Sequence, residues 1–262
     1  MNLTQSEKLS PVSTAAQKAA GNKIAVLTAY DYPMARLLEE AQVDWLLVGD
    51  SLGMVVLGYP DTTFVTLADM VHHTSAVARG AKNTPIIADL PIGTYLTPEM
   101  AVTSARSLIQ AGAHAVKLEG GAEFADRIAA LVSEGIPTMG HIGMLPQRVR
   151  EEGGYKIKGR TQAEGDQIVA DAVALQHAGA FGMVIELVEP QTTARVTKAV
   201  TIPTIGIGSG PHCDGQVLVT QDLIGAFPWF RPRFVTPIAS TGEIVKQAAA
   251  SFVSSTKTAS VS

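Results

Sequence analysis

The sequence predicts a single-domain α/β protein, a closed (β/α)8 TIM barrel of parallel strands. Short apolar runs alternate with helical patterns along most of the 262 residues, which is typical of repeated βα units. The apolar runs are continuous rather than alternating, as expected of strands that are covered on both faces. A doubly wound open sheet also fits this alternation, but eight units in roughly 230 residues favour the closed barrel.

The strands and helices follow from the apolar pattern and its breaks. One helix is expected to begin with Thr97 as its capping residue and Pro98 in its first turn. A closing helix is expected from about Gly242. The predicted strands are 24–27, 45–48, 85–88, 115–118, 137–140, 181–185, 203–207 and, as the least regular, 221–225.

Both ends of the chain differ in composition from the predicted barrel, which spans residues 21–250. The first twenty residues are mostly polar or small, and residues 251–262 are rich in Ser, Thr and Ala. Such segments bury little apolar surface to offset their chain entropy. We therefore expect a flexible N-terminal tail over 1–20 and a flexible C-terminal tail over 251–262.

The composition excludes several classes of protein. Hydrophobic residues make up 46% of the chain and charged residues 17%, which is too apolar for a disordered protein. The net charge of −4 gives no electrostatic reason to expect nucleic acid or an anionic membrane as a partner. No apolar run approaches a membrane span, no signal peptide is recognisable, and Cys213 is the lone cysteine. We expect a cytoplasmic protein.

Ionisable side chains stand at the carboxyl ends of five consecutive predicted strands. In a parallel barrel this end of the strands forms the face on which active sites are built. Lys117 and Glu119 are two residues apart, so they point to the same side of their strand. The complete set is Asp50, Asp89, Lys117, Glu119, His141 and Glu186.

Most members of this set also have a structural explanation when taken alone. Asp50 or Asp89 can be a turn or capping residue, Lys117 can extend to solvent, and a lone histidine such as His141 is commonly a hydrogen-bonded core residue. Carboxylates that follow apolar strands, as Glu186 does, are rare unless they are paired. Capping explains each residue separately but not their convergence, which favours an active site.

The donor atoms of the set indicate a metal site of hard oxygen ligands. Asp50, Asp89 and Glu119 supply carboxylates, for which Mg²⁺ is the usual occupant, at one ion per subunit. Zinc is not expected, because His72 and His73 are adjacent on a predicted helix and cannot face the same ion.

Three segments each permit two interpretations. Residues 143–161 are too long for an ordinary βα link and form either a lid or a solvated insertion. Residues 206–210 are rich in glycine but lack the G-x-G-x-x-G pattern, so they form either a phosphate-binding loop or a tight turn. The aromatic stretch 227–234 either contacts another subunit or packs down as the last loop of the barrel.

Several blocks in unbroken order, between about Lys23 and Gln247, carry a family resemblance. They are Thr28-Ala29-Tyr30-Asp31, Val48-Gly49-Asp50-Ser51-Leu52-Gly53-Met54, Ala88-Asp89-Leu90-Pro91, Val116-Lys117-Leu118-Glu119-Gly120-Gly121, Gly140-His141-Ile142-Gly143, Gly153-Gly154-Tyr155-Lys156 and Asp214-Gly215-Gln216. These blocks closely resemble the ketopantoate hydroxymethyltransferase family, whose (β/α)8 barrel is of the phosphoenolpyruvate mutase/isocitrate lyase type.

The resemblance implies a reaction and an assembly. Members convert 3-methyl-2-oxobutanoate and the co-substrate 5,10-methylenetetrahydrofolate into 2-dehydropantoate in pantothenate biosynthesis, the route to coenzyme A. They use Mg²⁺, which would stabilise an enolate that attacks the folate-borne one-carbon unit. Members are commonly homo-oligomers, often decamers.

The resemblance also implies roles for individual residues. Asp50 and Asp89 would bind the metal, with Glu119 in its coordination environment, and Glu186 would accept the proton from C3 of the keto acid. Leu145 departs from the family, which often has Thr at this position, and leaves the local contacts of the predicted lid open. The keto acid would contact Asp50, Ser51, Asp89 and Lys117.

Two other functions stay open on the sequence. A Mg-dependent C–C or C–P lyase or mutase of the related superfamily would share the metal carboxylates and would act without folate. A non-catalytic barrel would show no Mg-dependent turnover of any keto acid. The family resemblance favours the hydroxymethyltransferase.

Overall fold

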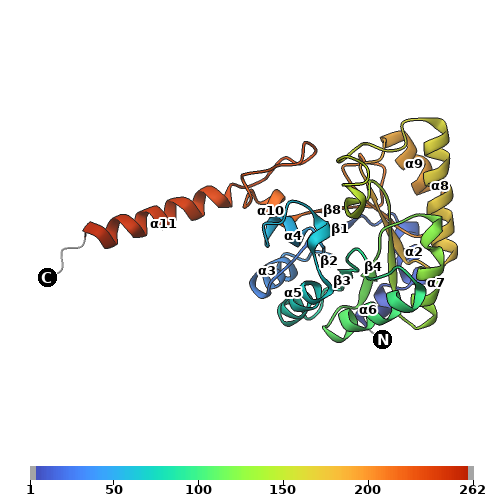
Figure 1. Cartoon of the computed structure of the whole chain (residues 1–262), viewed down its shortest axis with the longest axis horizontal. Coiled ribbons are helices and arrows are strands. Elements are labelled where there is room, and N and C mark those ends of the chain that lie inside the picture. The colour runs from blue at the N-terminus through green and yellow to red at the C-terminus, as the bar shows by residue number, and fades with distance from the viewer. Residues whose placement is uncertain (1–3, 259–262) are drawn as a thin grey trace. The chain divides into compact units, whose positions relative to one another are not determined.

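The computed structural model, which describes residues 4–258, contains a closed barrel of parallel strands that follow one another in chain order. Helices surround the strands (Figure 1), so the predicted (β/α)8 barrel is confirmed. The strands are β1 (Ile24–Thr28), β2 (Trp45–Val48), β3 (Ile86–Asp89), β4 (Ala115–Lys117), β5 (Thr138–Gly143), β6 (Gly182–Glu186), β7 (Thr204–Ile207) and β8 (Gly215–Leu218).

The helices of the barrel unit, residues 1–217, begin at well-formed caps. Asp31, Thr66, Thr97 and Thr161 each accept a hydrogen bond from a backbone N–H in the first turn of the following helix. The described helices are α1 (Gln5–Lys8), α2 (Pro11–Ala19), α3 (Tyr32–Glu40), α4 (Leu52–Val55), α5 (Leu67–Gly80), α6 (Pro98–Gln110), α7 (Ala125–Ser133), α8 (Gln162–His177) and α9 (Pro190–Ala199), with 3-10 turns η1 (Thr62–Phe64), η2 (Ala122–Phe124) and η3 (Pro146–Arg148).

Buried apolar side chains form two clusters, one between the strands and the helices and one inside the barrel. The inner cluster takes at least one side chain from every strand, including Trp45, Ile87, Met139, Ile205 and Val217. Alternate residues of each strand thus fill the interior, as in other barrels of this kind.

Residues 5–19, for which the sequence led us to expect a flexible tail, form α1 and α2. Thr4 and Glu7 make a capping box at the start of α1. Leu9 is fully buried in the inner cluster, and the Thr14 hydroxyl donates a 2.6 Å hydrogen bond to the carbonyl of Phe181. A mostly polar segment therefore closes the amino-terminal end of the barrel through a few apolar and hydrogen-bonded contacts.

Two strands differ from their predicted positions. β5 continues to Gly143, so His141 lies within the strand rather than directly after it. The prediction of the eighth strand at 221–225 was wrong, because β8 is Gly215–Leu218 and Thr220–Leu223 is the short helix α10. A Cβ atom on Gly215 would lie 2.3 Å from the carbonyl oxygen of Ile24, so glycine is needed where β8 meets β1.

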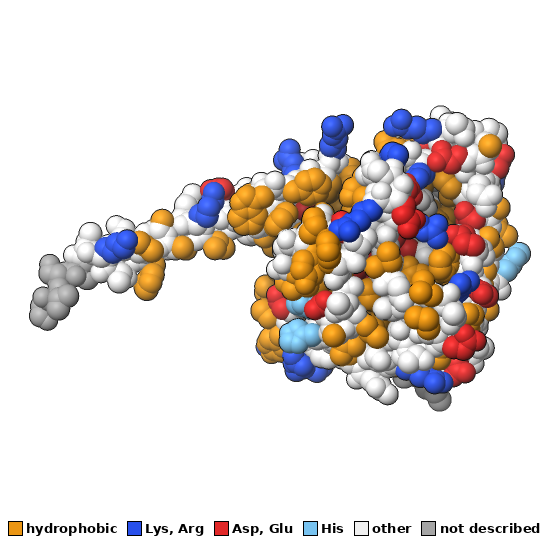
Figure 2. All heavy atoms as spheres, viewed as in Figure 1, with side chains coloured by type: hydrophobic (Ala, Val, Ile, Leu, Met, Phe, Trp, Pro, Cys, Tyr) orange, Lys and Arg blue, Asp and Glu red, His pale blue; other side chains and the backbone are white. Residues whose placement is uncertain are grey.

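Residues 218–262 form a second compact unit. Its helix α11 (Thr241–Thr258) begins close to the predicted start, and apolar side chains occur along it (Figure 2). Phe252 on this helix is exposed. Residues 251–258, expected to belong to a flexible tail, are helical here, and 259–262 lie outside the described residues. Over the described part of the chain, no helix combines the length and apolar character that crossing a membrane requires.

Candidate active site

Predicted site residues meet at the carboxyl ends of β2 to β6. Strand register places Asp89 beside Lys117 and Gly143 beside Glu186. Charged side chains are mostly exposed to solvent in proteins, but those of this cluster are almost fully buried. Relative exposure is 4% or less for Asp50, Asp89, Lys117, Glu119 and His141.

Asp89 is the centre of one half of the cluster. Its Oδ1 atom lies 3.1 Å from Nζ of Lys117 in a buried ion pair, and its Oδ2 accepts a 3.1 Å hydrogen bond from the backbone N–H of Asp50. The negative charges of Asp89 and Glu119 raise the pKa of Lys117 although burial alone would lower it. Lys117 is therefore a cation in the folded protein.

His141 joins this half to the other carboxylates. Its Nδ1 lies 3.3 Å from Nζ of Lys117 and 3.6 Å from Oε1 of Glu119, and its Nε2 lies 3.3 Å from Oε2 of Glu186. Burial, and then the charge of Lys117, lowers the pKa of His141 well below its usual value. A neutral imidazole that accepts at Nδ1 from Lys117 carries its proton at Nε2, on the side of Glu186.

The carboxyl groups of the cluster have raised pKa values, so they are more readily protonated than usual. Burial, and then the neighbouring Asp89, raises the pKa of Asp50 to about 7. Burial raises the pKa of Glu186 to about 8, although Lys117 opposes this change, and burial followed by Asp50 raises that of Glu119. Strongly raised pKa values in one buried cluster are typical of functional sites.

Gln147 is a member of the cluster that the sequence did not predict. It lies in η3, after β5, and is only 3% exposed. Its side chain contacts Asp50 and its backbone contacts Glu119. Neither periodicity nor a strand end marks Gln147, because it reaches the site from a loop, and no sequence signal distinguishes it from a solvated loop residue.

Ser51 lies at the edge of the cluster, after β2. Its hydroxyl is 2.8 Å from that of Tyr30, which is almost completely buried. Gly49 permits this arrangement, because a Cβ atom there would lie 2.8 Å from Oγ of Ser51. The predicted substrate-binding residues Asp50, Ser51, Asp89 and Lys117 thus come together at one end of the barrel.

The cluster fits a divalent cation held by few protein ligands. Among the described residues, no three His, Cys, Asp or Glu side chains surround one point closely enough to form a complete ligand set. Magnesium commonly uses one or two carboxylates and completes its shell with water and substrate oxygens. Asp50 and Asp89 suit this mode, since both are buried carboxyl groups at adjacent strand ends and a cation would offset the repulsion that helps to raise the pKa of Asp50.

Comparison with known proteins decides the family. The family model described as ketopantoate hydroxymethyltransferase matches residues 9–261. The chain belongs to this family. A relative from Heliobacterium modesticaldum is 49% identical over 233 residues, which cover 88% of this chain and 84% of the relative, and one from Pyrobaculum aerophilum is 52% identical over 233 residues, covering 88% of each. Both are named 3-methyl-2-oxobutanoate hydroxymethyltransferase.

Solved structures of other proteins share the fold of this chain. Phosphonopyruvate hydrolase in complex with oxalate and Mg²⁺ matches with a TM-score of 0.63 at 16% identity, over 83% of this chain and 81% of that one. The 2,3-dimethylmalate lyase, described as a PEP mutase/isocitrate lyase superfamily member, matches with a TM-score of 0.61 at 17% identity, over 98% and 89%. These likenesses agree with the predicted barrel fold.

The backbone after Glu186 is held in an unusual conformation in this family member. Leu187 has a φ of 48°, a left-handed conformation that is costly for a leucine and often found at functional sites. The fully buried Ser209 supports it, because its hydroxyl donates to the carbonyl of Ile185 at 2.7 Å and accepts from the N–H of Val188 at 3.0 Å. Of the two interpretations of residues 206–210, these bonds favour the tight turn.

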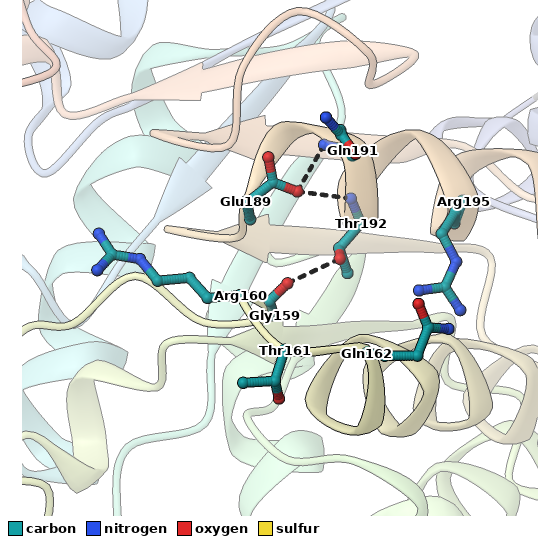
Figure 3. Close-up of a pocket in the computed structure, with 8 residues that line it drawn as sticks. All are labelled: Gly159, Arg160, Thr161, Gln162, Glu189, Gln191, Thr192 and Arg195. Carbon is teal, nitrogen blue, oxygen red and sulfur yellow. Dashed lines mark hydrogen bonds between the residues drawn. The ribbon is translucent and has the colours of Figure 1, made fainter.

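A surface pocket of about 340 Å³ is lined by none of the predicted site residues (Figure 3). Glu189 caps α9 there, with its carboxylate accepting from the N–H groups of Gln191 and Thr192, and Arg195 pairs with Asp166. The polar groups of the pocket are thus largely satisfied by hydrogen bonds and ion pairs with neighbouring residues. The buried cluster is therefore the better candidate for the chemistry. The lining residues are Gly159, Arg160, Thr161, Gln162, Glu189, Gln191, Thr192 and Arg195.

Proposed function

We propose that this protein transfers a hydroxymethyl group from 5,10-methylenetetrahydrofolate to 3-methyl-2-oxobutanoate, which gives 2-dehydropantoate for pantothenate biosynthesis. The observation that carries the proposal is the buried cluster, in which Lys117 contacts Asp89 and His141. His141 in turn contacts Glu119 and Glu186, so side chains at the ends of β3 to β6 meet. Family membership and the names of the relatives support the choice of substrate.

The keto acid brings a carboxylate and a ketone oxygen, so its binding site must supply positive charge. Lys117 is the buried cation of the site, and Ser51 offers a hydroxyl after β2, at the edge of the cluster. Asp50 and Asp89 are the groups that would hold Mg²⁺, and Glu119 is placed to accept hydrogen bonds from the water around it. When bound, Mg²⁺ supplies a Lewis acid that stabilises negative charge on the substrate oxygens, a contribution of several kcal/mol.

Glu186 is the group that would remove the proton from C3 of the keto acid. Its raised pKa of about 8 makes it a stronger base than an ordinary carboxylate while it is still partly ionised near neutral pH. General-base catalysis contributes about 10²–10⁴-fold to a rate, or about 3–5.5 kcal/mol. The neutral His141 at 3.3 Å adds no competing charge and can turn its Nε2–H toward the reacting oxygens.

Burial of the cluster would protect the resulting carbanion equivalent from water before it attacks the one-carbon unit. Residues 143–161 are the segment that would act as the lid. Its far end is fixed to the strand that carries Glu186, because the N–H of Lys158 donates to the carbonyl of Leu187 at 2.8 Å. The segment is thereby coupled to the base.

The proposal extends to the setting of the enzyme. We infer one Mg²⁺ per subunit, a homo-oligomer that is a decamer by family resemblance, and a place in the cytoplasm. The net charge of −4 gives no electrostatic reason to expect nucleic acid as a partner, and small molecules are the partners that we propose.

Product formation in a defined mixture tests the proposal. The protein should form 2-dehydropantoate only when the keto acid, 5,10-methylenetetrahydrofolate and Mg²⁺ are all present, and Asp89→Asn should lower kcat/KM at least about 100-fold because it removes a buried charge at the metal. Asp166→Asn, at an exposed ion pair, is the matched control and should keep full activity. Consumption of the keto acid without folate would instead indicate a lyase.

A further inference from the structure

We propose that Gln147 is a positioning residue, whose amide and backbone hold the carboxylates of Asp50 and Glu119 in the arrangement that binds Mg²⁺. The inference rests on the proposed function, which places the metal at this cluster. Gln147 lies outside the set of residues that the sequence assigned to the metal, the keto acid or the proton transfer.

Gln147 uses both its side chain and its backbone to make hydrogen bonds. Its Nε2 atom donates to Oδ2 of Asp50 at 2.8 Å and to the carbonyl of Leu90 at 3.0 Å. Its backbone N–H donates to Oε2 of Glu119 at 3.0 Å, and its Oε1 accepts from the hydroxyl of Tyr95. Both amide hydrogens and the amide oxygen are therefore used, inside a region that water does not reach.

The partners permit only one orientation of the amide. The Asp50 carboxylate, when ionised, and the Leu90 carbonyl can accept hydrogen bonds but cannot donate them, so the amide nitrogen must face both. The Tyr95 hydroxyl then donates to the amide oxygen. A flipped amide would place three oxygens against one another in a buried site, where an unsatisfied polar group is costly. Tyr95 thus fixes Gln147, and Gln147 fixes Asp50.

Charge explains why an amide suits this position. Asp50, Asp89 and Glu119 are carboxyl groups buried close together, joined by the hydrogen bonds of Gln147 and of the Asp50 N–H. A neutral amide supplies two donors without adding a negative charge, as glutamate would, and without adding a cation that competes with Mg²⁺, as lysine would. Gln147 can therefore orient a ligand while leaving the charge of the site to the metal.

The position of Gln147 in the chain adds a second consequence. Residue 147 belongs to η3, near the start of the segment 143–161 that would cover the site. The same residue that holds Asp50 and Glu119 thus fixes the beginning of this segment, while Lys158 fixes its far end through Leu187. Metal affinity and placement of the segment should change together when Gln147 is replaced.

Calorimetric titration of the purified full-length protein with MgCl₂ tests the inference without relying on turnover. Gln147→Met keeps the length of the side chain but removes its donors and acceptor, and it should weaken Mg²⁺ binding about 10–100-fold, as loss of a residue that orients a metal ligand does. Tyr95→Phe removes only the hydroxyl that fixes the amide, and it should weaken binding by a smaller factor, about 2–10-fold.

Gln176→Met is the matched control. Gln176 also accepts hydrogen bonds, from the N–H groups of Thr201 and Ile202 at 2.6 and 3.3 Å. It lies near the end of α8 and contacts the segment before β7 rather than the cluster, so Mg²⁺ affinity should not change. Wild-type affinity in folded Gln147→Met would overturn the inference. If Gln147→Met does not fold, wild-type affinity in Tyr95→Phe overturns it. Absence of Mg²⁺ binding in the wild type itself would overturn the proposed metal site.

Discussion

At the scale of single residues, the cluster owes its properties to buried charges that are paired incompletely. Lys117 offsets part of the negative charge of Asp50, Asp89 and Glu119. The neutral ring of His141 lies between Lys117 and Glu186. Burying more carboxylates than cations costs free energy in the folded state. Such a cost is common where a protein must bind a cation and a substrate.

The raised pKa of Glu186 predicts a pH dependence. Proton removal needs the ionised carboxylate, and because burial raises its pKa to about 8, the exchange of the C3 proton of 3-methyl-2-oxobutanoate should be slow at pH 6 and rise until about pH 9. NMR measurement of exchange in buffered D₂O with Mg²⁺ checks this. Glu189→Gln, at a helix cap outside the cluster, should show the same profile. A rate that is constant from pH 6 to 9 would exclude titration of the base in this range.

Much of this cluster could be predicted from the sequence, for a specific reason. Asp50, Asp89, Lys117 and Glu186 end or follow strands, and the carboxyl ends of parallel strands meet at one face of a barrel. Gln147 could not be predicted, because no periodicity places a residue of a long loop. The roles assigned to the ligands and the base stay predictions.

At the scale of elements, the ends of β5 and β6 set the position of the base. Gly143 is paired with Glu186 and has a φ of 93°. A Cβ atom at this position would lie 2.4 Å from the carbonyl oxygen of Glu186 and 2.5 Å from Val188. Glycine here lets β5 approach the strand that carries the base.

Gly143→Ala should therefore affect activity and stability together. The added methyl group must displace the backbone of Glu186, so kcat should fall at least about 10-fold, because small displacements at a reacting centre are costly. The free energy of unfolding should fall by about 2–4 kcal/mol, from backbone strain and overpacking. Enzyme kinetics and urea denaturation measure the two effects.

Gly153→Ala provides the comparison for Gly143→Ala. Gly153 also has a positive φ, 68°, but no atom lies within 4 Å of an added Cβ, so only backbone strain of about 1–2 kcal/mol is expected. Equal losses of activity and stability in the two variants would show that the contact with Glu186 does not matter.

Element boundaries were predictable where apolar runs stood between clear breaks, as for β2. They were not predictable where a strand depends on a distant partner. β8 begins at Gly215, which resembles a turn residue in the sequence but lies against Ile24 of β1. Only closure of the barrel makes this glycine a strand residue.

At the scale of the barrel unit, the amino-terminal helices complete the packing. Leu9 joins Trp45, Phe181 and other strand residues in the inner cluster, and Thr14 binds the carbonyl of Phe181. Composition alone favoured a tail at 1–20, because one buried leucine and a few hydrogen bonds, such as those of Thr14 and Lys18, are invisible in an average over twenty residues.

Leu9→Ala should destabilise the protein without changing its chemistry. Removing a fully buried leucine costs about 2–5 kcal/mol in the free energy of unfolding, and the far end of the barrel should keep its kcat. Val12→Ala in α2, where the valine is 83% exposed, should cost much less. Thermal unfolding compares the variants, and an unchanged Tm for Leu9→Ala would show that residues 5–19 do not pack as described.

The central claim is that the buried cluster abstracts the C3 proton of the keto acid through Glu186. Proton NMR in D₂O, with Mg²⁺ and 3-methyl-2-oxobutanoate but no folate, measures this step directly. The wild type should exchange the C3 proton, and Glu186→Gln, which keeps the shape but not the charge, should slow exchange by about 10²-fold or more. Undiminished exchange in a folded Glu186→Gln variant would contradict the account.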